Sequence, residues 1–393
     1  MTRTRTSLAV AVATLFAAAL VILPATSASA ATVTTTIAGV TYEGDDTAVA
    51  AGATVTAYSG AATSIAIPST VTIGANIYTV VAIGNGAFDT DPGGHNSGSQ
   101  LTSVTLPSTL VSIADNGFAR NNLTSVTIPN SVTSLGGGAF FDNAIASLTI
   151  GSGITAIPAA GFTTNALTSL VIPNTVTSIG GDAFSGNPLL TSVTFGNSLS
   201  FIDHDAFTNS PFTTLTFPAS VTSIGTHAFN GTNTLTDVRF NGNAPAVPGG
   251  EPFYDPALPS APTVHFLWRN TGFTTPTWQG YPSVAIALVE FNGNGGSAPA
   301  TEEVEVGDTA TDPGASSRPG RVFSGWFTAA TGGTRYNFSS AVAGDVLLFA
   351  QFEALAATGT DINPVYPIGA GALVLGGIAL AVFGRRRAAA HRR

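Results

Sequence analysis

The chain has 393 residues, enough for two or three domains, and only 9% of them are charged. It contains no cysteine, which excludes disulfides and thiolate metal sites. All 13 basic residues are arginine, and residues 31–358 carry six of them against 21 acidic residues, a formal net charge of −15. Phosphate binding needs a basic patch, so this balance argues against a nucleic-acid partner.

Residues 1–30 have the features of a secretory signal. Arg3 and Arg5 precede an apolar run at residues 8–23, and a small-residue cleavage site of the A-x-A type ends at Ala30. The mature protein is therefore expected to begin at Ala31. The alternative is an N-terminal membrane anchor, for which the run is short.

Residues 31–64 are rich in threonine, alanine and glycine, and we expect them to form an N-terminal cap over the open edge of the region that follows. A polar, glycine-rich insertion at residues 89–100 reads as a surface loop. Asp89, Asp91, His95 and Asn96 lie in it, but a calcium loop needs a longer series of oxygen ligands ending in glutamate. No metal is therefore expected there.

Residues 65–240 repeat one unit, of which residues 123–140, LTSVTIPNSVTSLGGGAF, are a clear copy. After a first interval of 30 residues the spacing is 22 or 23, a period that indicates a solenoid of stacked coils. Alternation along the strand turns Val126 and Ile128 inward and Ser125 and Thr127 outward. One phenylalanine closes each unit and should join an internal column: Phe88, Phe118, Phe140, Phe162, Phe184, Phe207 and Phe229.

Two further positions recur in the unit. A turn position ahead of the phenylalanine holds glycine in several units, where freedom at positive φ is expected to be useful: Gly84, Gly136, Gly180 and Gly225. Asparagine follows the phenylalanine by three residues, which suits a turn whose side chain bonds the backbone: Asn121, Asn143, Asn165 and Asn187.

These units resemble the leucine-rich repeats of the BspA-like class, whose pattern is close to L-x-x-L-x-L-P-x-x-L-x-x-I-G-x-x-A-F. The resemblance covers roughly residues 64–240 and implies a curved, ligand-binding solenoid of the kind common on microbial cell envelopes. In such repeats the outward strand face usually binds partners. The candidate ligand-binding residues are therefore Ser103, Thr105, Ser125, Thr127, Ser147, Thr149, Ser169, Ser192, Thr194, Thr214 and Thr216. The competing explanation is that threonine simply favours strands, and the face lacks large aromatic anchors.

Residues 241–283 interrupt the 22-residue period and are dense in proline and glycine. We expect a C-terminal cap or linker whose aromatic side chains cover the last coil, because the end of a solenoid needs cover. The alternative is an aromatic platform that binds sugars. The aromatic residues concerned include Tyr254, Trp268, Trp278 and Tyr281.

Residues 284–353 read as a second module, in which VEFNGNGG, GRVFSGWFTAATGGTRYNFSS and DVLLFAQF follow one another. Their order and spacing resemble the Listeria–Bacteroides repeat, also called the internalin-type B repeat. The resemblance implies a small β-grasp-like module that often acts as a spacer in surface proteins. Trp326 and its aromatic neighbours are expected to pack the core of this module.

Residues 354–393 have the layout of a sorting signal. An uncharged run at residues 365–383 would make a transmembrane helix about 30 Å long, the thickness of a bilayer core, and five arginines follow it. The motif ahead of the run resembles the LPxTG signal of sortase substrates, in an LAxTG form: Leu355, Ala356, Ala357, Thr358 and Gly359. The resemblance implies that sortase cuts after Thr358 and joins it to peptidoglycan, so that the membrane is only a transient partner. The alternative is a permanent single-span anchor.

Groups that could support catalysis converge in one place. Asp182, Asp205 and His227 occupy the same position in successive units, with His204 adjacent, and stacking would place them about 5 Å apart. The same column holds glycine, asparagine or alanine in other units, which favours a solvated turn. We find no nucleophile motif, phosphate loop or zinc-ligand spacing, and therefore expect no enzyme activity, metal or cofactor.

We therefore predict a mainly β protein, extracellular and anchored to the cell wall, whose leucine-rich solenoid binds an extracellular protein or glycan. The first alternative is a structural envelope protein without a specific ligand. A distant alternative is an enzyme that uses His204 and Asp205.

Overall fold

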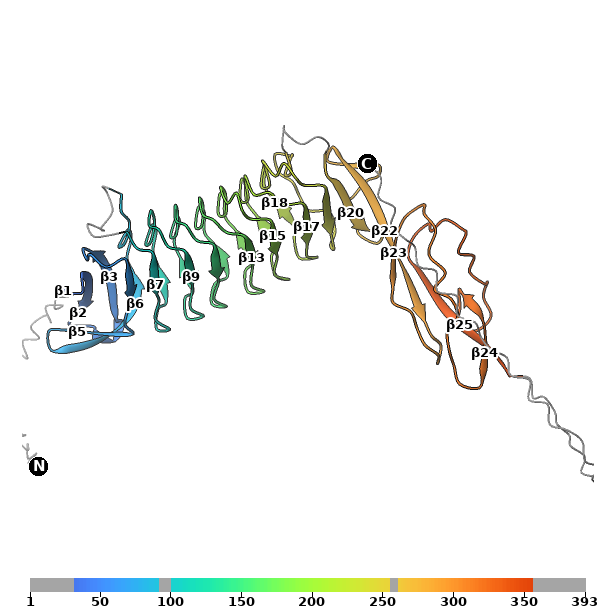
Figure 1. Cartoon of the computed structure of the whole chain (residues 1–393), viewed down its shortest axis with the longest axis horizontal. Coiled ribbons are helices and arrows are strands. Elements are labelled where there is room, and N and C mark those ends of the chain that lie inside the picture. Colours follow the sequence, from blue (N-terminus) through green and yellow to red (C-terminus); the bar gives the residue numbers. More distant parts are fainter. Residues whose placement is uncertain (1–31, 92–99, 255–260, 356–393) are drawn as a thin grey trace, which may run out of the picture.

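The structure is a computed structural model, and it describes residues 32–91, 100–254 and 261–355. Within these ranges there are 25 strands and a single 3-10 turn, η1 (Val49–Ala51), so the predicted mainly β fold is confirmed. The chain forms an arched row of coils followed by a second module (Figure 1). The described ranges hold no helix long and apolar enough to span a membrane. The expected signal at residues 1–30 and the expected helix at residues 365–383 lie outside them.

The first strands close the open end of the solenoid. β1 (Thr32–Ile37), β2 (Val40–Asp45) and β3 (Ala53–Tyr58) are antiparallel, and β3 then pairs in parallel with β6 (Asn76–Ile83). β5 (Thr70–Ile73) forms a hairpin with β6. Tyr42, Tyr58 and Tyr78 are fully buried beneath these strands. Large rings thus cover the first coil.

Each coil then contributes two short strands to two rows of parallel strands, here called the first and second ladder, in which hydrogen-bonded pairing is interrupted between some neighbouring coils. The first ladder contains β4 (Ser64–Ala66), β7 (Ser103–Thr105), β9 (Ser125–Thr127), β11 (Ser147–Thr149), β13 (Ser169–Val171), β15 (Ser192–Thr194), β17 (Thr214–Phe217) and β19 (Asp237–Phe240). The second contains β8 (Ser112–Ile113), β10 (Ser134–Leu135), β12 (Ala156–Ile157), β14 (Ser178–Ile179), β16 (Phe201–Ile202) and β18 (Ser223–Ile224). The repeat period sets the register, so that Ser147 lies opposite Ser125 and Thr149 opposite Thr127.

The phenylalanines form the predicted column. From Phe88 to Phe229 successive rings are stacked, with centroids 4.7–5.5 Å apart and planes within 14° of parallel. All seven are fully buried. Burial of each ring contributes about 1.5–3 kcal/mol, so the column is a main source of cohesion between coils.

The asparagines three residues later do more than shape their own turn. The amide of Asn121 donates to the carbonyl of Phe88 in the preceding coil (2.7 Å) and to that of Ala119 in its own (2.9 Å). Its Oδ1 accepts the N–H of Leu101 at 2.9 Å. Asn143, Asn165 and Asn187 repeat this bridge between coils. The predicted backbone bonding is therefore confirmed, and it also ties each coil to the one before it.

Residues with positive φ, the left-handed backbone conformation, do not lie at the turn glycines where they were expected. From the coil of Phe118 to that of Phe229, positive φ occurs two residues before and two residues after the phenylalanine, as at Ala160 (53°) and Thr164 (56°). Gly84, Gly136, Gly180 and Gly225 do not have positive φ, so that expectation was wrong. Their glycine reflects close approach instead, because a Cβ at Gly136 would lie 2.3 Å from a backbone nitrogen of the preceding coil.

The parallel ladder does not stop at the last repeat. β19 pairs with β20 (Thr263–Leu267), which pairs with the first part of β22 (Tyr281–Asn292). The last residues of β22 pair with β25 (Val346–Ala354), which pairs with β24 (Arg321–Phe327). β21 (Thr277–Trp278) and β23 (Glu302–Glu305) flank β22. One sheet therefore runs from the solenoid into the second module, in which Trp326 is 2% exposed within a separate core.

The segment between the repeats and the second module covers the end of the solenoid core with rings. Phe253, Trp278 and Tyr281 are buried in that core, as the cap interpretation expected. Tyr254 (41%) and Trp268 (49%) remain exposed. The aromatic residues therefore divide between core packing and surface.

Candidate binding surface

The first ladder presents its hydroxyl side chains to solvent. Strict alternation buries or half-buries the middle residue of each strand and leaves its neighbours outside. All eleven predicted serine and threonine positions are exposed, and in-register pairing places serine beside serine and threonine beside threonine in two rows. The rows are interrupted at Val171, which is 65% exposed. The structure thus brings these residues together on one face of the solenoid, the strand face.

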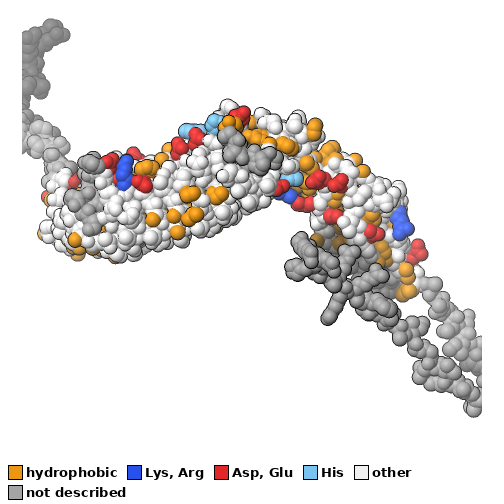
Figure 2. Space-filling model, turned by 45° about the horizontal axis from the view of Figure 1, so that its top comes forward, with side chains coloured by type: hydrophobic (Ala, Val, Ile, Leu, Met, Phe, Trp, Pro, Cys, Tyr) orange, Lys and Arg blue, Asp and Glu red, His pale blue; other side chains and the backbone are white. Residues whose placement is uncertain are grey.

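At its C-terminal end the strand face changes from hydroxyl to charged side chains. Asp237 and Arg239 on β19 stand beside Thr214 and Thr216 on β17, and His265 on β20 stands beside Arg239. With Glu303 and Glu305 on β23 they line a groove of about 410 Å³, here called the junction groove. Figure 2 shows charged side chains gathered where the solenoid meets the second module, while much of the solenoid carries few.

Most charges in the junction groove are paired. Arg239 binds Glu303 through two N–H groups, one of them 2.6 Å from Oε1, and this hydrogen bonding lowers the pKa of Glu303. Nε2 of His265 lies 3.2 Å from Oδ1 of Asp237. Across the described ranges the carboxylate of Glu305 has no hydrogen-bond or ion-pair partner. The groove therefore combines free hydroxyls with one uncommitted carboxylate, a set that accepts hydrogen bonds from sugar hydroxyls or backbone amides.

The acidic and histidine cluster lies on the turn edge of the solenoid. Nδ1 of His204 is 2.9 Å from Oδ1 of Asp203, and this hydrogen bond raises the pKa of His204. Burial, followed by the charge of Asp205, raises the pKa of Asp182. Nε2 of His227 is instead 4.0 Å from Glu251. Among the described residues no three such side chains are grouped to hold a metal ion. The stack thus brings Asp182, Asp205 and His204 close enough to interact.

Other predicted functional residues fall at the margins of the described chain. Leu355 is exposed at its end, whereas Ala356, Ala357, Thr358 and Gly359 lie outside it. The predicted cleavage site between Ala30 and Ala31 also lies outside. Sequence reasoning missed the junction groove. Glu303 is 64 residues from Arg239, and no repeat links the two segments.

Two known protein families match this chain, one over the solenoid and the other over the second module. The BspA type leucine rich repeat region matches residues 95–211 and 155–250 in six copies. The Listeria-Bacteroides repeat domain matches residues 288–351.

Solved structures of leucine-rich repeat proteins are also similar to this chain. A leucine rich cell surface protein from Faecalibacterium prausnitzii is 24% identical over 60% of this chain and 70% of that one, with a TM-score of 0.43. A leucine-rich repeat protein from Bacteroides ovatus is 20% identical over 62% and 74%, with a TM-score of 0.42. The leucine rich repeat protein of T. pallidum is 20% identical over 56% and 79%, with a TM-score of 0.32. From the repeat and domain matches, the chain carries a BspA-type leucine-rich repeat region followed by one Listeria–Bacteroides repeat domain.

Proposed function

We propose that this protein is anchored to a bacterial cell wall and binds an extracellular glycan or protein through the strand face and the junction groove. The observation that carries the proposal is the exposed, in-register double row of hydroxyls that ends beside the free carboxylate of Glu305. Proteins of this family are typically extracellular or surface-exposed and typically not enzymes. An interaction or adhesion role is consistent with that family.

Binding is tested by retention of the protein on arrays of glycans and extracellular proteins. The double variant Thr127→Arg and Thr149→Arg places two long cations on the strand face and should abolish retention. A matched control is Ser134→Arg with Ala156→Arg, which adds the same charge at exposed positions of the second ladder. Equal loss in both variants would show non-specific charge effects, and no retention of the unmodified protein on any panel would favour a structural envelope protein without a ligand.

Attachment to the wall rests on the LAxTG motif and is tested separately. Mass spectrometry of fragments released by wall-degrading enzymes should find a C-terminal peptide that ends at Thr358 and carries a peptidoglycan stem. A fragment that continues through residues 365–383 would instead indicate a permanent membrane anchor.

A further inference from the structure

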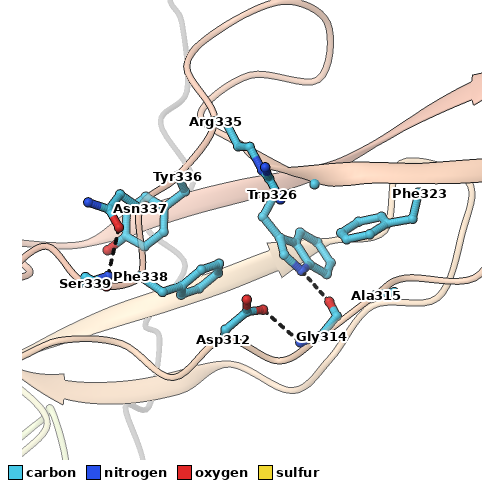
Figure 3. A pocket seen from close by; sticks show the side chains of 11 residues that line it. Asp312, Gly314, Ala315, Phe323, Trp326, Arg335, Tyr336, Asn337, Phe338 and Ser339 are labelled. Atoms are coloured by element: carbon cyan, nitrogen blue, oxygen red, sulfur yellow. Dashed lines mark hydrogen bonds between the residues drawn. The ribbon is translucent and has the colours of Figure 1, made fainter.

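A second pocket lies in the Listeria–Bacteroides module, on other elements than the strand face and the junction groove. Its volume is about 550 Å³, within the range that holds a small ligand. Figure 3 shows its walls, which come from the segment of Asp312 and Gly314, from β24 with Trp326, and from the segment that carries Arg335 and Phe338. Polar and aromatic side chains converge on it from all three.

Arg335 places a positive charge at the pocket wall, and this charge forms no ion pair among the described residues. Arg120, Arg239 and Arg269 each have a carboxylate within 4.0 Å, whereas Arg335 has none across the described residues. Its side chain crosses β24 at Gly325, where an added Cβ would lie 2.7 Å from Nε of Arg335. Glycine at that position therefore makes room for the guanidinium. Although residues 31–358 have a formal net charge of −15, the unpaired guanidinium of Arg335 at the pocket wall is available to bind an anion.

The backbone around Arg335 is held in place by hydrogen bonds. The N–H of Tyr336 donates to the carbonyl of Trp326 at 2.8 Å, and the N–H of Thr328 donates to that of Thr334 at 3.0 Å. The amide of Gln351 donates to the carbonyl of Ala329 at 2.9 Å. The base of the Arg335 side chain is thus fixed before any ligand arrives, which lowers the entropic cost of binding.

The other groups in the pocket suit a sugar ring. Oδ1 of Asp312 accepts the N–H of Gly314 at 2.9 Å, and Oδ1 of Asn337 accepts that of Ser339 at 3.0 Å. Within the described chain, Oδ2 of Asp312 and the amide nitrogen of Asn337 have no partner and remain available for hydroxyls. Tyr336 and Phe338 meet edge to face at 4.9 Å and are half-buried. Their accessible ring surface can pack against sugar C–H groups.

Trp326 is a floor of the pocket and not a stacking platform. It is 2% exposed, and its Nε1 donates to the carbonyl of Gly314 at 2.9 Å.

We propose that this pocket binds a uronate residue of an acidic polysaccharide, with its carboxylate on Arg335, its hydroxyls on Asp312 and Asn337, and its apolar face on the rings of Tyr336 and Phe338. A guanidinium binds a carboxylate through two parallel N–H bonds, which gives both charge and orientation.

The test measures calorimetric binding of tetragalacturonate and of its fully methyl-esterified form, which keeps the sugar and removes the charge. We expect the acid to bind at least 10-fold more tightly than the ester. Arg335→Gln should lose that preference, with at least a 10-fold weaker affinity for the acid. Arg321→Gln is the matched control: Arg321 is also exposed and has no carboxylate partner among the described residues, but it lies outside the pocket, so affinity should stay within twofold.

Several results would overturn the assignment. They are no binding of tetragalacturonate at millimolar concentration, equal affinity for acid and ester, or equal losses in the two arginine variants. Tighter binding of a tripeptide with a free C-terminal carboxylate would reassign the pocket to peptide ends. The strand-face variant Thr127→Arg with Thr149→Arg should leave this binding unchanged, so failure here and failure of the proposed function are distinguishable.

Discussion

Replacement of Asn121, which joins two coils by hydrogen bonds, should destabilise the solenoid more than replacement of the adjacent Asn122. Asn121 is 4% exposed, and Asn121→Ala leaves the N–H of Leu101 without its side-chain acceptor and also removes the bond to the carbonyl of Phe88. A buried polar group left unsatisfied costs about 1–3 kcal/mol, so loss of the acceptor for Leu101 alone predicts a loss of about 1–3 kcal/mol. Asn122→Ala removes only an exposed bond to Gln100, and its effect should lie within about 0.5 kcal/mol.

Urea unfolding followed by circular dichroism measures both variants. Amide exchange offers a local check, because the N–H of Leu101 should exchange faster in Asn121→Ala and not in Asn122→Ala. Asn121→Asp adds a sharper comparison: it keeps an acceptor for Leu101 but places a carboxylate against the carbonyl of Phe88, so it should also destabilise. If Asn121→Ala and Asn122→Ala unfold within 0.5 kcal/mol of one another, the bridge between coils does not carry the stability assigned to it.

Three further predictions concern the turns. Gly136→Ala should destabilise by about 1–3 kcal/mol in urea because its Cβ would lie 2.3 Å from backbone, whereas Gly137→Ala meets nothing nearer than 3.6 Å and should be tolerated; equal losses would contradict the close-approach argument. Thr164 has φ 56°, so Thr164→Gly should be about 0.5–1 kcal/mol more stable than Thr164→Ala, and the reverse order would exclude strain there. The hydrogen bond that His204 donates to Asp203 raises the pKa of His204, so NMR titration should find a lower His204 pKa in Asp203→Asn. The stability from that pair is present below about pH 6.5 and is lost as the pH rises through the raised pKa; an unchanged pKa would contradict the pairing.

The solenoid was predictable because identical residues at a fixed period must lie above one another. The spacing from Phe118 to Phe140 predicts a stacked pair, and the rings are 5.3 Å apart. The role of the turn glycines was not predictable in the same way. Glycine permits both positive φ and close backbone approach, and a single letter cannot distinguish the two. The structure assigns close approach to Gly136 and positive φ to Gly138 two residues later.

The candidate site likewise has one part that the sequence predicts, the strand face, and one part that it does not, the junction groove. The alternation of Ser125, Val126 and Thr127 already indicated which side chains face outward, and their exposure follows from that pattern. The junction groove depends on β22, a single strand whose two ends pair with different parts of the chain. Pairing between segments that share no repeat leaves no periodic pattern, so the approach of Glu303 to Arg239 could only be found in the structure.

The regularity of the strand face also limits what it can recognise. Ser125 and Thr127 recur as Ser147 and Thr149 one coil away, so a ligand that contacts only these rows meets nearly the same surface after a shift of about 4.8 Å. Such a ligand would bind in several registers, and several short ligands would fit on one chain. The junction groove occurs once in the described part of the chain, so a ligand that contacts Glu305 should bind with a single register and a stoichiometry of one. Stoichiometry therefore separates the two modes. A repeating polymer held by the rows alone should saturate at more than one short oligomer per chain, and Glu305→Gln should not change its affinity. A partner specific for the groove should bind once per chain and should lose affinity in Glu305→Gln.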